Sequence, residues 1–310
     1  MKKIIKKFII ILIFIFTFSE SAFSEKINVA FAIDNNYWLY TLLTINSILK
    51  NNTSNSDYYF YVIESDLSNK NRIKMEKYVK KHHQNIKFID IDLSVIDSGH
   101  DYYKDSSNLK HISRISMARI FLPDLLPDLN KVLYLDSDIL VTADLSELYN
   151  MNVKNYAALM TKNIDIPCYN AGVMLVNLDY WRKNNITQKM VNYIKKKKSL
   201  QYMDQDLINI ILMKKIKTIN PRWNNQYGYM SNHNNIVHYI GGYKPWLINV
   251  RLMQNTTEYF EKRPYIKLYN DYWRNSDLFA YKFPVRTKQL FKIYLDYCNI
   301  MSEKLYNNVY

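Results

Sequence analysis

The sequence predicts an α/β protein built on an open sheet of parallel strands with helices packed against it. Short apolar runs of strand length alternate with segments of helical periodicity, and several of these runs end directly in polar turns. Alternating strands and helices form βαβ units with parallel strands, and such open sheets bind ligands at the carboxyl ends of the strands. We therefore expect the functional residues in the turns that follow the strands.

The first third of the chain carries three of the expected strands. Apolar runs occupy residues 27–33, 58–63 and 86–91, and helical spacing occupies residues 37–49 and 69–81. Ser68 directly precedes the second helix and is its expected N-cap, because a serine oxygen can accept a hydrogen bond from an unpaired backbone amide there.

The rest of the chain continues this pattern as far as about residue 250. Residues 111–122 have helical spacing, and Pro123 and Pro127 are expected to end that helix before a buried strand at 132–135. Further strands are expected at 156–160, 172–177 and 236–240, and amphipathic helices at 179–198 and 204–214. From about residue 251 the segments become rich in tyrosine, lysine and arginine, which indicates a tail rather than a second core.

Length and composition are those of an ordinary globular protein. The chain has 310 residues, 48% hydrophobic and 23% charged, which suits one large α/β domain with a tail. The formal net charge is +14, but the cations are spread along the chain, mostly in helical segments where a solvated face explains them. We therefore expect no nucleic-acid partner. Two cysteines, Cys168 and Cys298, do not indicate a disulfide framework.

Residues 1–24 have the layout of a secretory leader. Lysines precede an apolar run at residues 8–18, and small or polar residues follow it. The run is shorter than the roughly 17–25 residues that span a bilayer. Cleavage after Ser24 and retention as a signal anchor are both open, so the chain is expected to be exported or membrane-associated, with the side of the membrane undecided.

The strongest candidate site is Asp136-Ser137-Asp138, which follows the buried strand 132–135. Two carboxylates separated by one residue at a strand end point to the same side and can bind one divalent cation, such as Mn²⁺ or Mg²⁺. Such a cation can hold a diphosphate. A solvated turn is the alternative for this motif alone, and the preceding buried strand favours the metal site.

The second candidate is the segment 237–246. His238, at a strand end, can give a neutral imidazole to the same cation, while Gly241 lets backbone amides approach a phosphate and Lys244 supplies a positive charge for it. Taken alone, His238 is as well explained as a structural histidine.

Three weaker motifs accompany these two. Asp204-Gln205 begins a helix, where an acidic cap is the alternative explanation, and Asn170-Ala171-Gly172 precedes a strand. The turn Asp34-Asn35-Asn36-Tyr37 presents an aromatic ring that could stack on a base. In isolation the last two would be plain loops.

The order and spacing of the five motifs resemble glycosyltransferase family 8, in particular the bacterial lipooligosaccharide galactosyltransferases and glucosyltransferases. The match runs from about residue 29 to 246 and includes residues 60–63, 111–113 and Ala118-Arg119. The resemblance implies a GT-A fold over residues 25–250, with a mixed, mostly parallel sheet flanked by helices, and a helical, basic and aromatic tail over 251–310. It also implies a retaining transferase that moves galactose or glucose from a UDP-sugar to a saccharide acceptor, such as lipopolysaccharide or another glycoconjugate.

By the same resemblance each motif has an expected role. The cation ligands are Asp136, Asp138 and His238, and the uridine-binding turn is Asp34, Asn36 and Tyr37. The diphosphate contacts are Gly241 and Lys244, and the residues lining the sugar site are Arg119, Asn170, Asp204 and Gln205. Ser137 would contact the base or ribose.

The chemistry expected at the sugar is same-face displacement. The family retains configuration at the anomeric carbon, yet its position for a nucleophile carries Gln205, and an amide is a poor nucleophile. The departing diphosphate would then help to deprotonate the acceptor while Gln205 steadies the positive charge on the sugar. Asp204 is expected to bind the sugar rather than attack it.

Alternatives from other classes fit the sequence less well. A sugar-nucleotide nucleotidyltransferase needs a glycine-rich phosphate loop near the N-terminus, and residues 34–37 contain no glycine. A basic carbohydrate- or nucleic-acid-binding protein without catalysis would need no pair of metal-binding carboxylates. For the tail, contact with an anionic membrane that carries a glycolipid acceptor and ordinary packing on the main domain are both open.

Overall fold

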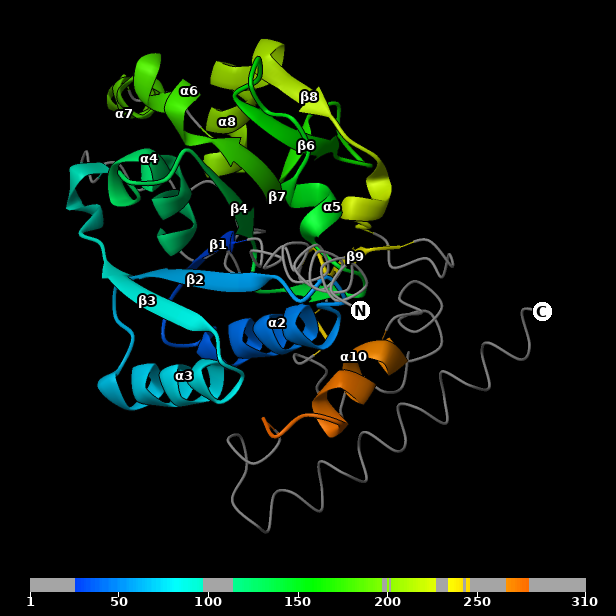
Figure 1. Cartoon of the computed structure of the whole chain (residues 1–310). Coiled ribbons are helices and arrows are strands. Elements are labelled where there is room, and N and C mark those ends of the chain that lie inside the picture. Colours follow the sequence, from blue (N-terminus) through cyan, green and yellow to red (C-terminus); the bar gives the residue numbers. More distant parts are fainter. Residues whose placement is uncertain are drawn as a thin grey trace, which may run out of the picture.

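The protein is built around a seven-stranded sheet (Figure 1). The computed structural model describes residues 26–96, 114–196, 200, 202–226, 234–241, 244–245 and 266–278. In spatial order the strands are β3 (Asn85–Asp90), β2 (Asp57–Glu64), β1 (Lys26–Ile33), β4 (Lys131–Leu135), β7 (Tyr169–Asn177), β6 (Ala158–Lys162) and β8 (Ile216–Thr218).

The sheet is mixed and mostly parallel, as predicted. Strands β1, β2, β3 and β4 run parallel to one another, and β8 is parallel to β6. Strand β7 runs antiparallel to both β4 and β6. The amino end of β7 therefore lies at the same edge of the sheet as the carboxyl ends of β1 and β4.

A second, two-stranded sheet pairs β5 (Ile139–Val141) with β9 (Ile236–His238) in antiparallel fashion. The sequence pattern did not predict β5, because its three residues continue from the polar turn after β4. Their register sets Ile139 opposite His238. The small sheet thus fixes the distance between the turn after β4 and a residue about one hundred positions later.

Helices lie on both faces of the large sheet. The main α-helices are α2 (Trp38–Lys50), α3 (Asn69–Lys81), α6 (Leu178–Lys183), α7 (Ile186–Lys195), α8 (Asp204–Leu212) and α10 (Ile266–Arg274). The remaining helical elements are α4 (Leu122–Leu125), α5 (Ser146–Tyr149) and the 3₁₀ helices η1 (Leu93–Ile96), η2 (Arg114–Phe121), η3 (Met213–Lys215) and η4 (Pro221–Trp223). Ser68 caps α3 as expected, accepting a hydrogen bond from the Asn71 amide.

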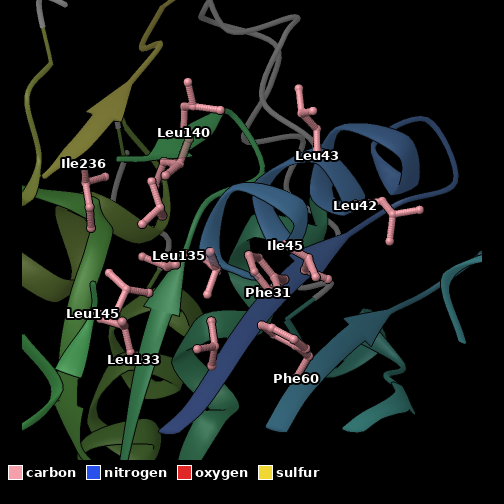
Figure 2. Packing of buried hydrophobic residues seen from close by; sticks show 14 of the residues in the cluster. Phe31, Leu42, Leu43, Ile45, Phe60, Leu133, Leu135, Leu140, Leu145 and Ile236 are labelled. Carbon is pink, nitrogen blue, oxygen red and sulfur yellow. The ribbon is translucent and has the colours of Figure 1, made fainter. Parts of the chain in front are cut away.

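Alternation along the central strands divides the apolar residues between two cores. In β1, Val29 and Phe31 face the core that includes α2 and α3, whereas Ala30 faces the core formed with η2, α6, α7 and α8. Figure 2 shows the first core, with Phe31 and Phe60 beside Ile45 of α2. Burial on both faces explains why these strands read as continuous apolar runs.

Two helix predictions were wrong in detail. The expected helix at 179–198 is interrupted at Asn185, which has a left-handed backbone (φ 50°) and separates α6 from α7. Asparagine tolerates this conformation better than most residues, so the break is local. The described part of the expected helix at 111–122 is the 3₁₀ helix η2, and Pro123 lies in the first turn of α4 instead of ending a helix. Proline fits there because first-turn amides need no helical partner.

Helix α10 is the described part of the predicted tail, and it packs on the main domain. Tyr269 and Trp273 are buried in the core that contains α2, and the Asn51 side chain donates a hydrogen bond to the Tyr272 hydroxyl (2.6 Å). Among the described helices, none combines the length and the apolar character needed to cross a membrane. The predicted leader and the rest of the tail lie outside the described residues.

Candidate active site

A cavity of about 430 Å³ opens where β1 and β4 end and β7 begins, beside the start of α8. Most of the predicted site residues line it, although they come from six separate segments of the chain. They are Tyr37, Arg119, Asp136, Ser137, Asp138, Asn170, Asp204, Gln205, His238, Gly241 and Lys244. Asp34 and Asn36 do not line it, and residues 111–113 lie outside the described part of the chain.

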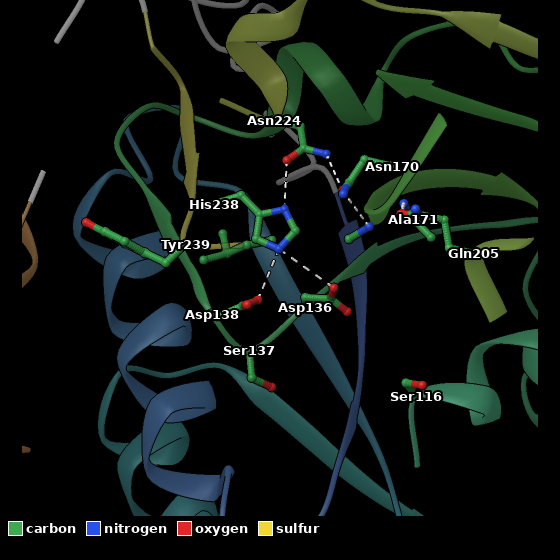
Figure 3. A network of polar contacts seen from close by, with 12 residues as sticks. Ser116, Asp136, Ser137, Asp138, Asn170, Ala171, Gln205, Asn224, His238 and Tyr239 are labelled. Atoms are coloured by element: carbon green, nitrogen blue, oxygen red, sulfur yellow. Dashed lines mark hydrogen bonds and ion pairs between the residues drawn. The ribbon is translucent and has the colours of Figure 1, made fainter. Parts of the chain in front are cut away.

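Asp136, Asp138 and His238 form a compact group of potential metal ligands. One ligand atom from each lies within 4.8 Å of the others. The Nε2 atom of His238 is 3.1 Å from Asp138 Oδ1 and 3.8 Å from Asp136 Oδ2 (Figure 3). Both backbones are fixed, since Asp136 N donates to Gly172 O (2.9 Å) and Tyr239 N donates to Asp138 O (2.9 Å).

The chemistry of this group fits a divalent cation. Carboxylate oxygens suit Mn²⁺ and Mg²⁺, and an imidazole in the set favours a transition metal such as Mn²⁺ over Mg²⁺. The other ring nitrogen of His238, Nδ1, is 2.9 Å from the Asn224 side-chain oxygen. This is the arrangement of histidines that bind metals, in which the second nitrogen is held by a hydrogen bond.

Gly172 explains how His238 reaches this position. A Cβ atom placed on Gly172 would lie 2.1 Å from His238 Cε1 and 2.8 Å from Asp136 Oδ2. The imidazole therefore packs directly on the Gly172 backbone. The small residue in the Asn170-Ala171-Gly172 motif serves this close approach.

Lys244 is buried and forms an ion pair with Asp138, and it also donates to Tyr239 O (2.6 Å). Burial alone would raise the pKa of Asp138, but the positive charge of Lys244 and the contact with His238 outweigh it and hold that pKa well below its usual value. Lys244 was predicted as a diphosphate contact, and in the structure its ammonium group neutralises a cation ligand.

Arg119 is the centre of a buried charge network that adjoins the group of potential metal ligands. Its guanidinium contacts Asp136 Oδ1 (2.8 Å) and Asp204 Oδ2 (2.9 Å), and it donates to Ala171 O (2.7 Å) and to Ser116 O (3.0 Å). Burial would lower the pKa of Arg119, but the two carboxylates raise it above its usual value, so the side chain stays charged.

Asp204 and Gln205 begin α8 and line the same cavity. Ser116 Oγ donates to Asp204 Oδ1 (2.7 Å), so both carboxylate oxygens have partners. Burial raises the pKa of Asp204, and Arg119 and Ser116 only partly oppose it. Gln205 Oε1 accepts a hydrogen bond from Ala171 N (3.2 Å), and its Nε2 lies 3.7 Å from Cys168 Sγ. The carboxylate of Asp204 points into the protein instead of capping the helix.

The turn after β1 holds Tyr37 at the cavity. Asn36 N donates to Asp34 Oδ1 (2.8 Å) and Tyr37 N donates to Asp34 O (3.1 Å), so Asp34 shapes the turn. Burial, and next the charge of Asp138, raise the pKa of Tyr37. The Thr41 hydroxyl contacts Ser137 Oγ (2.8 Å), which ties the tripeptide to helix α2.

Four site residues were missed by sequence reasoning. Ser116 and Asn224 hold Asp204 and His238, Tyr134 donates its hydroxyl hydrogen to Asp136 Oδ1 (3.0 Å), and Tyr202 lines the cavity. Tyr134 stands inside a buried strand, and a buried phenol needs a polar partner, which was a usable signal. Tyr202 belongs to the segment Tyr202-Met203-Asp204-Gln205-Asp206 at the start of α8, which was noticed for its acids, whereas Ser116 and Asn224 carried no pattern that could have identified them.

The fold and this site define a glycosyltransferase of the GT-A type. Residues 28–249 match the model of the family described as "Glycosyl transferase family 8", more than half of the chain. The chain therefore belongs to glycosyltransferase family 8, as its motifs indicated.

The chain is also similar to named proteins and to solved structures. The chain is 26% identical over 279 residues to general stress protein A of Bacillus subtilis, covering 78% of this chain and 95% of the relative. It is 24% identical over 264 residues to the lipopolysaccharide 1,3-galactosyltransferase of Salmonella typhimurium, covering 74% and 76% of the two chains. The structure of galactosyltransferase LgtC with donor and acceptor sugar analogues has the same fold, with a TM-score of 0.62 at 24% identity and coverage of 76% of this chain and 95% of that chain.

Proposed function

We propose that this glycosyltransferase moves a hexose, galactose or glucose, from a UDP-sugar to a saccharide acceptor with retention of configuration. The observation that carries the proposal is one cavity lined by three candidate cation ligands and, next to them, by Arg119, Asp204 and Gln205. The acceptor is proposed to be lipopolysaccharide or another glycoconjugate, as the name of the Salmonella relative suggests.

The metal is proposed to be Mn²⁺ or Mg²⁺, held by Asp136, Asp138 and His238. When bound, it would neutralise charge on the diphosphate, which makes UDP a better leaving group. Electrostatics support the need for it. A diphosphate placed beside two carboxylates is repelled, and the nearby cation Lys244 is already paired with Asp138.

The donor is proposed to span the cavity from Tyr37 to Gln205. The partly buried Tyr37 ring suits stacking on a uracil base. Ser137 is held near the Tyr37 turn by its contact with the Thr41 hydroxyl. Gly241 has a left-handed backbone (φ 75°) and lines the cavity together with Lys244, so its backbone would lie near the diphosphate. The hexose would then lie against Asn170, Asp204 and Gln205, with Asp34 and Asn36 supporting the base from outside the cavity.

Same-face displacement is the proposed route. Both oxygens of Asp204 are occupied, by Arg119 and Ser116, which makes that carboxylate a poor nucleophile. Gln205 is held by the Ala171 amide through its oxygen. The leaving diphosphate would accept the proton of the acceptor hydroxyl, and Gln205 would steady the sugar.

Two further proposals concern the ends of the chain. The leader at residues 1–24 would place the enzyme at or across a membrane, because lysines precede its apolar run. The cationic and aromatic remainder of the tail would contact an anionic membrane that presents the acceptor. The leader lies outside the described residues, and only residues 266–278 of the tail are described.

The test is UDP release by the full chain from a panel of UDP-hexoses, with and without Mn²⁺. We expect Mn²⁺-dependent release from one donor, its loss in Asp138→Asn, and its retention in Asp144→Asn. Asp144 is a matched control because its carboxylate accepts hydrogen bonds from the backbone amides of Ser54 and Ser146, away from the cavity. Absence of UDP release from every donor would refute the proposal, and NMR of the product anomer would test retention.

A further inference from the structure

A chain of buried amides leads from the backbone of β7 to His238. Asn170, Asn224 and His238 are 6%, 1% and 3% exposed. Asn224 Nδ2 lies 2.8 Å from Asn170 Oδ1, and Asn224 Oδ1 lies 2.9 Å from His238 Nδ1 (Figure 3). Neither the cavity lining nor the family's motifs in this sequence draw attention to Asn224.

The direction of every hydrogen bond in this chain follows from its first member. Gly172 N–H can only donate, and it donates to Asn170 Oδ1 (3.0 Å), so that atom is an acceptor. Its neighbour from Asn224 must therefore be the NH₂ group. The Asn224 oxygen then faces His238 Nδ1, and because an amide oxygen can only accept, Nδ1 carries a proton.

We propose that Asn170 and Asn224 are positioning residues that keep the proton of His238 on Nδ1 and so present Nε2 to the cation. Nε2 is the nitrogen that faces Asp138 Oδ1 and Asp136 Oδ2. The inference rests on the metal centre of the proposed function.

Substitutions at position 224 separate the two hydrogen bonds of Asn224, one to His238 and one to Asn170. Asn224→Ala removes both the acceptor for His238 and the donor to Asn170. Asn224→Asp keeps an acceptor for the Nδ1 proton but loses the donor. Gln226→Ala is the matched control, since Gln226 is also buried, 2% exposed, in the same segment and donates to Lys162 O (2.9 Å) away from the site.

The first measurement is ¹⁵N NMR of the metal-free full chain labelled at histidine, with His238→Gln used to assign the signal. We expect a protonated Nδ1 in the wild type, in Asn224→Asp and in Gln226→Ala, and mixed protonation of the two nitrogens in Asn224→Ala. An unprotonated Nδ1 in the wild type would overturn the proposal, and that result needs no variant to fold.

The second measurement is Mn²⁺ affinity by titration calorimetry, on samples whose folding is checked by circular dichroism. We expect Asn224→Ala to weaken Mn²⁺ binding by about 10–100-fold, the usual effect of losing a hydrogen bond to a metal-bound histidine, with Asn224→Asp less affected and Gln226→Ala unchanged. An Asn224→Ala variant that binds Mn²⁺ as tightly as the wild type would overturn the proposed role of Asn224. A wild type that binds no Mn²⁺ would instead refute the metal centre, while the NMR result would still decide whether Asn224 positions His238.

Discussion

Replacing Gly172 by alanine tests whether the imidazole of His238 really packs on the β7 backbone. The added methyl would lie 2.1 Å from His238 Cε1 and 2.9 Å from Nδ1. Carbon atoms in contact are normally about 3.5–4.0 Å apart, so the ring must move by roughly 1.5 Å. His238 is 3% exposed and held at both nitrogens, so no direction of movement is free of cost.

The size of the effect follows from these contacts. Overpacking of a buried site costs about 1–3 kcal/mol, and loss of the bond to Asn224 adds about 1 kcal/mol. We therefore expect the free energy of unfolding to fall by about 2–4 kcal/mol, which lowers Tm by roughly 3–6 °C in a chain of this size. Displacement of a ligand should weaken Mn²⁺ binding by at least about 100-fold, the upper end of the loss seen when only its hydrogen-bond partner is removed.

The assay is a thermal melt of the metal-free protein together with Mn²⁺ calorimetry. Gly241→Ala is the comparison, because a Cβ there meets nothing within 4 Å although its φ is 75°. That variant should lose about 1 kcal/mol through backbone strain and keep its Mn²⁺ affinity in the absence of nucleotide. If Gly172→Ala bound Mn²⁺ as tightly as the wild type and melted at the same temperature, the placement of His238 would be wrong.

Three other predictions concern charged residues. Arg119→Lys keeps the charge but cannot make all four contacts of the guanidinium. The free energy of unfolding, measured by urea titration, should therefore fall by about 3 kcal/mol, and turnover should be reduced. An unchanged urea midpoint would contradict the charge network around Arg119. Lys244→Met should destabilise the metal-free protein, because Asp138 loses its ion-pair partner. The rise in Tm on adding Mn²⁺ should be larger than in the wild type, because the metal would replace the lost charge beside Asp138. Equal rises in Tm for the variant and the wild type would contradict this prediction. Backbone and side-chain hydrogen bonds from Ser146 and Ser54 outweigh burial and lower the pKa of Asp144 from 3.8 to about 2. Its stabilising effect is therefore present above pH 4 and lost as pH falls towards 2. The difference between wild type and Asp144→Asn, at most about 1 kcal/mol after solvent screening, should shrink over that range in acid titrations, and a constant difference would contradict it.

The elements that were predicted well are those with a strong periodic pattern. Strands β1, β2 and β4 are apolar on both faces because each is buried between two cores, and α3 begins after a capping serine. The polar turns at their carboxyl ends were expected to converge. They do so because β1 and β4 are parallel neighbours, with Val29 opposite Leu133.

The parts that were not predicted depend on tertiary contacts. Helical spacing continues through Asn184 and Asn185, so periodicity could not locate the break between α6 and α7. The charge pairing of Asp204 with Arg119 was hidden because an acid at a helix start is also expected for the helix dipole. Asn224 follows a short 3₁₀ helix, and its role depends on β9 lying beside it.

The small sheet makes the cation site a product of folding rather than of the tripeptide alone. Helix α2 holds the loop after β4, since Thr44 Oγ1 donates to Ile139 O (2.8 Å) and Val141 N donates to Ser47 Oγ (2.9 Å). Strand β9 closes the other side and brings His238 opposite Ile139. The candidate ligands are therefore ordered by α2 and β9 in the metal-free protein, so a cation would spend less of its binding energy on ordering them. A solvated turn would lack these bonds, and this is the physical reason to interpret Asp136-Ser137-Asp138 as a prepared metal site.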